Sequence, residues 1–166
     1  LSKLKIEKIE EDAFENCPNL KQIIIDSDVK VPTQMIKDCP NLESIVVEEG
    51  NIRQDSRDNC NAVIRNVVAD RSPELVIGCK NTTIPDGVLS VGSYAFKGCK
   101  GLQEIEVPSS VTTIYQSAFY DCISLKSVVL GENITGINDL AFYNCYNLEK
   151  VVCLALTPPS KGASAF

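Results

Sequence analysis

Residues 13 to 25 read Ala13-Phe14-Glu15-Asn16-Cys17-Pro18-Asn19-Leu20-Lys21-Gln22-Ile23-Ile24-Ile25. The same pattern of Ala-Phe, then Cys, then Leu and a short apolar run recurs at residues 95–107, 118–130 and 141–153, and a degenerate copy occupies residues 35–47. Self-similarity at a fixed period is typical of repeat proteins, in which each unit stacks on its neighbours to bury its apolar side chains. The chain is therefore predicted to be a solenoid.

The period of the repeat follows from five cysteines at one motif position. Their steps are 22, 60, 23 and 23 residues, for Cys17, Cys39, Cys99, Cys122 and Cys145. The step of 60 contains one unit of 23 residues and a longer unit of 37. The ends of the apolar runs give the same count, with separations of 22, 37, 23, 23 and 23 for Ile25, Val47, Ile84, Val107, Leu130 and Cys153. Six rungs are predicted, one of them enlarged.

Each unit combines two local patterns. Its end alternates apolar and polar residues with period two, as in a strand with one buried face. The return segment spaces Val111, Ile114, Ala118 and Phe119 by three, four and one residues, which predicts a short helical turn. We expect an α/β repeat solenoid, a right-handed superhelix with a parallel sheet on one face and short helical turns on the other. Its strands should centre near Ile24, Val46, Thr83, Glu106, Val129 and Val152.

The repeat pattern lapses between Glu48 and Asn81. Two apolar runs in this segment, residues 61–64 and 75–77, flank a polar stretch around Asp70 to Pro73, which predicts a β-hairpin. The hairpin would occupy about residues 50–80 as an insertion in a single domain that covers residues 1–166. Both ends of the sequence fall within a repeat unit, so we interpret the chain as a fragment of a longer array.

The motif resembles that of one known family. The string Ile-Pro-x-x-Val-x-x-Ile/Val-Gly/x-x-x-Ala-Phe-x-x-Cys-x-x-Leu, nearly complete in residues 84–102, resembles the BspA-like, treponemal-type leucine-rich repeats of bacterial surface proteins. The resemblance covers essentially the whole chain, and it departs from the family at Met35-Ile36 and at Tyr115. It implies a leucine-rich repeat superhelix, an extracellular or cell-surface location, and adhesion to host proteins.

Composition narrows the range of partners. The chain has 166 residues, a net charge of -6 and no cluster of basic residues to neutralise a nucleic acid backbone. Its apolar runs are all far shorter than the roughly 20 residues of a membrane-spanning helix. Neither a nucleic acid partner nor membrane insertion is expected. The opening residues Leu1 to Leu4 do not follow the pattern of a secretory leader, so we expect a signal peptide to be either absent or already removed, and the location rests on the family resemblance.

The eight cysteines do not follow a metal-binding pattern. The chain has no Cys-x-x-Cys pair and no histidine, so zinc is disfavoured and no cofactor is expected. The five repeat cysteines should form a column of buried, reduced side chains that fill small apolar sites. Cys60 and Cys79 bracket the hairpin, and two alternatives stay open for them: a disulfide across its base, or two free thiols.

Catalytic patterns are missing as well. Ser-His-Asp and Cys-His arrangements need an imidazole, and no phosphate-binding glycine loop occurs. Glu104 and Glu106 lie two residues apart on a strand, so they point to one face and are expected to form a solvated acidic patch. The oxygen-bearing residues from Asp55 to Asn61 lack the central Gly and closing Glu of a calcium loop, which favours a turn. The chain is predicted not to be an enzyme.

The open face of the strands is the predicted binding surface. Two columns are expected there, one of Gln22, Ser44, Asn81, Glu104, Ser127 and Lys150, and one of Ile24, Val46, Thr83, Glu106, Val129 and Val152. Four exposed aliphatic residues in the second column are typical of a contact surface, although β-branched residues that only keep strands extended give the same pattern. The predicted ligand-binding residues are Ile24, Val46, Glu104, Glu106, Val129 and Val152.

These observations favour a non-catalytic binding scaffold. Its ligand would be a protein, and the family resemblance implies a host or extracellular-matrix protein. The hairpin is expected to project from the solenoid and to contribute to the contact. The alternative is a purely structural spacer or stalk that presents other domains.

Overall fold

The computed structural model describes residues 8–26, 29–51, 53–66 and 72–166. Its regular structure consists of short strands and one 3₁₀ turn. The elements are β1 (Phe14–Glu15), β2 (Gln22–Ile25), β3 (Ile36–Lys37), β4 (Ser44–Val47), β5 (Gln54–Asp55), η1 (Arg57–Asn59), β6 (Ala62–Asn66), β7 (Pro73–Gly78), β8 (Ser90–Val91), β9 (Glu104–Val107), β10 (Thr113–Ile114), β11 (Ser127–Leu130), β12 (Gly136–Ile137), β13 (Lys150–Cys153) and β14 (Ser160–Lys161).

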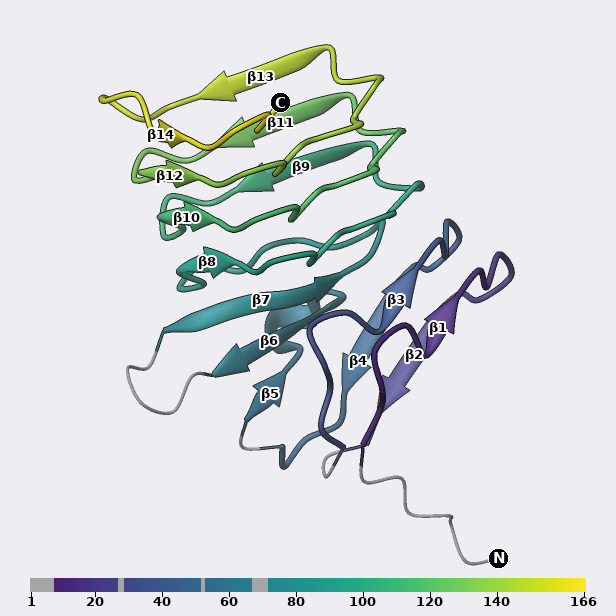
Figure 1. Ribbon diagram of the computed structural model, residues 1–166. Helices are drawn as coiled ribbons and strands as arrows, with labels where there is room; N and C mark the ends of the chain where they lie inside the picture. Colours follow the sequence, from purple (N-terminus) through teal and green to yellow (C-terminus); the bar gives the residue numbers. More distant parts are fainter. Residues whose placement is uncertain (1–7, 27–28, 52, 67–71) are drawn as a thin grey trace, which may run out of the picture.

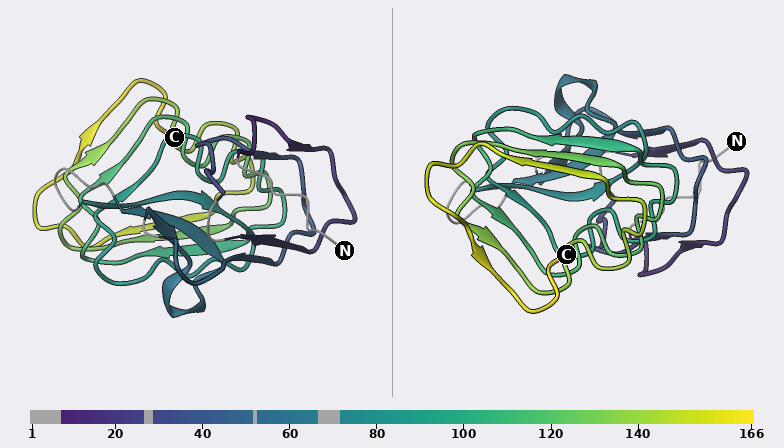
Figure 2. Two further views of the ribbon diagram at one scale, coloured as in Figure 1. Left: turned by 90° about the horizontal axis from the view of Figure 1, so that it is seen from below. Right: turned by 90° about the horizontal axis from the view of Figure 1, so that it is seen from above.

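The C-terminal stack, residues 90–161, is the regular part of the solenoid. The four-residue strands β9, β11 and β13 pair in parallel on one face. The two-residue strands β8, β10, β12 and β14 pair in parallel on a second face. Figure 1 shows these rungs stacked one above the other, and Figure 2 shows that each rung is offset from the next when viewed along the stack. The molecule is therefore a β-solenoid.

The second face of the solenoid consists of short strands and turns, so the expectation of helical turns there is wrong. Residues 111–119 form β10 and tight turns, and η1 is the one helical element within the described ranges. Ser117 and Asp121 adopt left-handed backbone angles, with φ of 55° and 60°, and the equivalent Leu140 and Asn144 do the same. An α-helix requires negative φ throughout, so a left-handed residue every four positions ends any helical turn. The spacing of apolar residues imitates a helix without forming one.

Residues 8–26 and 29–47 form a second, shorter stack, the N-terminal stack. β1 pairs with β3 and β2 pairs with β4, both in parallel. Figure 1 shows these strands inclined to the C-terminal rungs. The two stacks touch at one edge, where Lys100 Nζ lies 2.9 Å from Asp38 Oδ1. Lys80, which follows the hairpin, adds a contact to the N-terminal stack, with its Nζ 2.9 Å from Glu43 Oε1. Elsewhere the hairpin lies between them.

The hairpin expected from the two apolar runs is observed, with β6 antiparallel to β7. β7 also pairs in parallel with β8, and β6 pairs with β5, so the hairpin belongs to a seven-stranded sheet on the second face. Its side chains are buried on both sides: Ile64 and Leu75 pack in the core of the C-terminal stack, and Val63 and Val76 pack in that of the N-terminal stack. The expectation of a projecting hairpin is therefore wrong for these strands, which lie inside the fold.

The hairpin also divides the expected single sheet. β2 and β4 form one sheet, β9, β11 and β13 form another, and residues 81–83 between them form no strand. Thr83 N donates to the Cys60 carbonyl at 3.1 Å, and Lys80 N donates to the Leu42 carbonyl at 3.3 Å. The predicted strand at Asn81 to Thr83 is wrong because the enlarged rung uses its backbone to hold the base of the hairpin.

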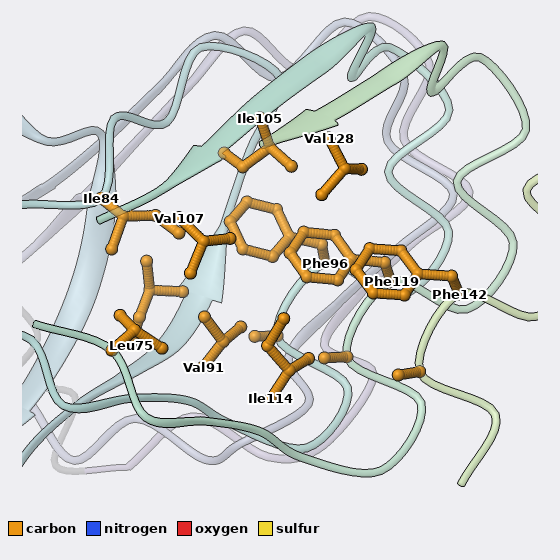
Figure 3. Packing of buried hydrophobic residues seen from close by; sticks show 14 of the residues in the cluster. Leu75, Ile84, Val91, Phe96, Ile105, Val107, Ile114, Phe119, Val128 and Phe142 are labelled. Carbon is orange, nitrogen blue, oxygen red and sulfur yellow. The ribbon is translucent and has the colours of Figure 1, made fainter. Parts of the chain in front are cut away.

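A ladder of phenylalanine rings fills the core of the C-terminal stack, as Figure 3 shows. The ring centroids of Phe96 and Phe119 are 4.8 Å apart, and so are those of Phe119 and Phe142, with interplanar angles of 9° and 3°. All three rings are buried core residues. Phe14 is half-buried and packs in the other core, outside the ladder.

The cysteine column predicted from the repeat is only partly buried. Cys39, Cys122 and Cys145 are buried, whereas Cys17 and Cys99 are half-buried, and all are free thiols. The Cys122 thiol donates to the Phe96 carbonyl at 3.1 Å, and the Cys145 thiol donates to the Phe119 carbonyl at 3.2 Å. Each of these two thiols therefore satisfies a buried carbonyl of the preceding rung.

Candidate functional site

The outward positions of β9, β11 and β13 form a surface that we call the C-terminal strand face. It consists of Glu104, Glu106, Ser127, Val129, Lys150 and Val152. In β9 the buried Ile105 and Val107 alternate with the two exposed glutamates. The strand register places Glu106 beside Val129, and Val129 beside Val152. Four of the six predicted ligand-binding residues therefore lie side by side, close enough for one partner to cover them.

The other two predicted residues lie on a separate surface, the N-terminal strand face, formed by Gln22, Ile24, Ser44 and Val46. Ile24 of β2 and Val46 of β4 are aligned in register, and their side chains are 61% and 37% exposed. No strand pairing connects this face to the C-terminal strand face, because the hairpin separates β4 from β9. The predicted column of six residues is therefore divided into two groups.

Charge is unevenly distributed over the C-terminal strand face. The exposed residues of β9 are both acids, whereas β13 carries Lys150 two strands away. β11 between them presents the uncharged Ser127 and Val129. None of the ion pairs formed within the described part of the chain involves Glu104 or Glu106. Both carboxylates are therefore available to a cationic group of a partner.

The base of the hairpin holds Cys60 and Cys79 as buried, free thiols. The Cys60 thiol donates to the Ala62 carbonyl at 3.7 Å, and the Cys79 thiol donates to the Asn61 carbonyl at 3.3 Å. Burial raises the pKa of the Cys60 thiol to about 11, so the group is protonated at neutral pH. A buried, protonated thiol is a poor nucleophile, and both side chains contribute to packing here.

The oxygen-rich segment after β5 forms a turn held by internal contacts. The Asp55 carboxylate accepts hydrogen bonds from Arg57 Nε at 2.7 Å and from Asn66 Nδ2 at 2.9 Å. Burial raises the pKa of Asp55, but these hydrogen bonds outweigh burial and the pKa is lowered. Within the described ranges, no three His, Cys, Asp or Glu side chains converge as metal ligands would.

A row of tyrosines lies at the turns of the C-terminal stack. The predicted ligand-binding residues do not include them. Tyr120 and Tyr143 follow the ladder residues Phe119 and Phe142, and their ring centroids lie 5.4 Å apart. Tyr146 is 78% exposed, and its hydroxyl donates to Asn144 Oδ1 at 2.7 Å. The Phe-Tyr dipeptide in two successive repeats is the signal that locates this row.

The repeated sequence of this solenoid matches that of a known protein family. A family model for the BspA type leucine rich repeat region matches residues 1–67 and 76–160, in six copies. The chain belongs to this family. Residues 68–75 lie between the two matched ranges of this BspA-type chain and are not covered by the family model. No curated protein sequence matches the chain.

Solved structures of several bacterial leucine-rich repeat proteins are similar to this BspA-type chain. The pneumococcal vaccine antigen PcpA is 25% identical, with a TM-score of 0.67 over 91% of this chain and 40% of its own length. The T. pallidum leucine rich repeat protein is 20% identical, with a TM-score of 0.55 over 98% of this chain and 69% of its own. A leucine rich cell surface protein from Faecalibacterium prausnitzii is 21% identical, with a TM-score of 0.50 over 89% and 51%.

These structures share the fold, and the BspA-type chain spans 40% of the length of the pneumococcal antigen. Among its described residues, no helix has the length and apolar character needed to cross a membrane.

Proposed function

We propose that this protein is a non-catalytic binding scaffold whose ligand is another protein. The observation that carries this proposal is the C-terminal strand face, where Glu106 adjoins Val129 and Val152 in register. Apolar side chains bordered by charged ones are typical of protein contact surfaces. Burial of the apolar area then supplies affinity, and the charges select the partner.

The charge pattern of β9 defines the partner's chemistry. Because Glu104 and Glu106 are both exposed, a partner that covers this face should present a basic group opposite them. The N-terminal strand face offers Ile24 and Val46 as a second, apolar contact for a larger partner. Apolar burial contributes roughly 25 cal/mol per Å² before association costs, so contact with both faces would increase affinity.

We further propose that the scaffold works outside the cell, at the cell surface or in secreted form, and mediates adhesion to host or extracellular-matrix proteins. Two observations support this location. One protein of similar fold is a cell surface protein, and another is a vaccine antigen.

A binding screen of the purified protein against extracellular-matrix proteins and glycans tests the proposal. For a ligand found in this way, Glu104→Lys combined with Glu106→Lys should reduce affinity, and so should Val129→Asp alone. The thermal midpoint should change little, because these side chains point away from the core. Binding should also weaken as salt is added, since exposed charges are screened.

The matched control for charge is Glu48→Lys combined with Glu132→Lys, two exposed glutamates outside the strand faces. This variant should keep the affinity of the parent protein. If the control loses as much affinity as the β9 variant, the interaction is non-specific attraction by net charge. If no substitution on either strand face changes adhesion, the protein is a spacer that presents other domains.

A further inference from the structure

A groove lies between the N-terminal stack and the hairpin. One wall comes from residues 8–11 and 30–33, and the other from residues 53–54 and 65–66. Its volume is about 720 Å³. Sites for small ligands have volumes of roughly 300 to 1,000 Å³, so the groove is large enough to hold one. None of the residues of the two strand faces lines it.

The two walls are joined at one carbonyl. Val31 O accepts hydrogen bonds from Gln54 Nε2 at 3.2 Å and from Arg65 Nη2 at 3.1 Å. Within the first wall, Ile9 N donates to the Lys30 carbonyl at 3.2 Å. Within the second, Asn66 N donates to the carbonyl of Arg53 at 2.8 Å. Two side chains therefore join the walls at Val31, and backbone hydrogen bonds order each wall, without a ligand.

Gln54 brings an unpartnered acceptor to this groove. The residue is only 4% exposed, and its Oε1 has no hydrogen-bond partner among the described residues. A buried acceptor without a partner destabilises a fold, so such groups are rare and call for an explanation. Gln54 lines the groove, and a change of its side-chain rotamer on binding would let Oε1 accept from an N–H or O–H donor of a ligand.

The charges that line the groove favour an anion. Among the described residues that line it, four are cationic, Lys8, Lys30, Arg53 and Arg65, and two are acidic, Glu10 and Glu11. The Nζ of Lys8 lies 2.9 Å from Glu10 Oε1, so these two already form a pair. The remaining side chains leave an excess of positive charge in a chain whose net charge is -6. An excess of this kind attracts anionic ligands.

The position of β5 favours an extended ligand. Gln54 and Asp55 form β5, which is the edge strand of the seven-stranded sheet. Edge strands are common places for an extended peptide to bind, because one side of the strand has no neighbouring strand.

We propose that this groove binds an extended, acidic peptide segment of a partner protein. A peptide N–H donates to Gln54 Oε1, and carboxylates of the peptide pair with Lys30 and Arg53. Arg65 keeps its bond to Val31 and holds the two walls together. The site is separate from both strand faces, so it does not rest on the function proposed for them.

Fluorescence anisotropy with a labelled peptide of alternating Glu and Gly residues tests this site in the full chain. Lys30→Glu and Arg53→Glu should each weaken the affinity for the peptide roughly tenfold, because each replaces an attraction by a repulsion. Lys161→Glu is the matched control, since it makes the same charge change at an exposed residue of β14. Its affinity should stay within about twofold of the parent value.

Gln54→Met distinguishes a ligand contact from a structural role. Methionine is also unbranched and flexible, but its sulfur is a weak acceptor. The Val31 carbonyl keeps its bond from Arg65, and the unpartnered Oε1 is removed. The thermal midpoint should therefore stay nearly unchanged while the affinity for the peptide falls about threefold or more. Loss of stability with unchanged affinity would contradict the assignment.

Three further results would overturn the proposal. The first is equal binding of a peptide that carries Gln in place of every Glu, and the second is an equal loss for Lys30→Glu and Lys161→Glu. The third is competition by free glutamate as effective as by the peptide, since the groove would then take a small carboxylate. Val129→Asp on the C-terminal strand face should leave peptide affinity unchanged, which keeps this test independent of the function proposed above.

Discussion

Gly78, the last residue of β7, lies directly against the ring of Phe96. A Cβ atom added at Gly78 would be 2.1 Å from Cε1 of that ring, closer than any real contact. Gly78 N also donates to the carbonyl of Ala95 at 2.9 Å, so the two segments are held together by their backbones. The hairpin thus meets the phenylalanine ladder at its first ring, where only a residue without a side chain fits.

Gly78→Ala should therefore destabilise the protein by about 3 kcal/mol, because the added methyl group displaces a buried ring. Gly87→Ala is an informative control, since Gly87 has a φ of 86° but nothing within 4 Å of an added Cβ. Strain alone should cost about 1 kcal/mol there. Urea unfolding of both variants measures the difference. Equal costs would show that the ring moves aside easily.

The cost in stability of removing a phenylalanine ring should depend on whether the ring lies within the ladder. Phe119 is fully buried and stacks on a ring at each side, so Phe119→Ala should cost on the order of 3 to 5 kcal/mol. Phe14→Ala should cost less, because Phe14 is half-buried and lies outside the ladder. Denaturant midpoints of the two variants test this order. A Phe119→Ala midpoint close to that of the parent protein would contradict the assignment.

Thiol reactivity should differ sharply between the cysteines. Cys153 is exposed, whereas Cys60 and Cys122 are 1% and 0% exposed. Burial also raises the pKa of Cys122 and Cys60, which lowers the fraction of reactive thiolate. Titration of the native protein with a coloured thiol reagent, followed by mass spectrometry, should label Cys153 first. Rapid labelling of Cys122 would rule out its buried position.

Cys60 makes stability depend on pH in the alkaline range. Its pKa is about 11 in the folded protein, compared with an ordinary value of 9.0. Below pH 9 the thiol is protonated in the folded and unfolded chain alike, and its contribution to stability is complete. Between pH 9 and 11 only the unfolded chain loses the proton, so stability falls by about 2 to 3 kcal/mol from this group.

The measurement is the free energy of unfolding at several alkaline pH values, compared between the parent protein and Cys60→Ala. The variant should lose less stability than the parent protein over this range. Cys153→Ala, which removes an exposed thiol, should follow the parent curve. Identical slopes for the parent protein and Cys60→Ala would show that Cys60 ionises normally in the folded state.

The positions of the rungs can be predicted from the sequence because every rung must bury the same kinds of side chain at the same positions. The apolar positions of β9, β11 and β13 must face the core, and Phe96, Phe119 and Phe142 must stack at one repeat distance. Spacing alone therefore locates these residues. It misidentifies the return segment, because the left-handed angles at Ser117 and Asp121 are decided by backbone geometry that apolar spacing does not report.

The candidate sites are less predictable, for a different reason. Ile24 and Val129 occupy equivalent repeat positions, yet they belong to different sheets because the hairpin fills the place of one strand. The groove at Gln54 is harder still to foresee. Two of its segments, residues 8–11 and 30–33, are equivalent repeat positions that pair at Lys8 and Lys30. Residues 65–66 belong to the hairpin and reach the groove only after the hairpin has packed on the N-terminal stack. The part of the site that the hairpin supplies follows from tertiary packing, which the repeat period does not report.

Burial of the hairpin on both sides has a consequence for how the molecule melts. In an array whose units contact only their neighbours, unfolding starts at an end and advances unit by unit. Here, loss of the N-terminal rungs would expose Val63 and Val76 to water, and loss of the C-terminal rungs would expose Ile64 and Leu75. Each half therefore shields one side of the hairpin from water. We expect the two halves to melt in one cooperative transition.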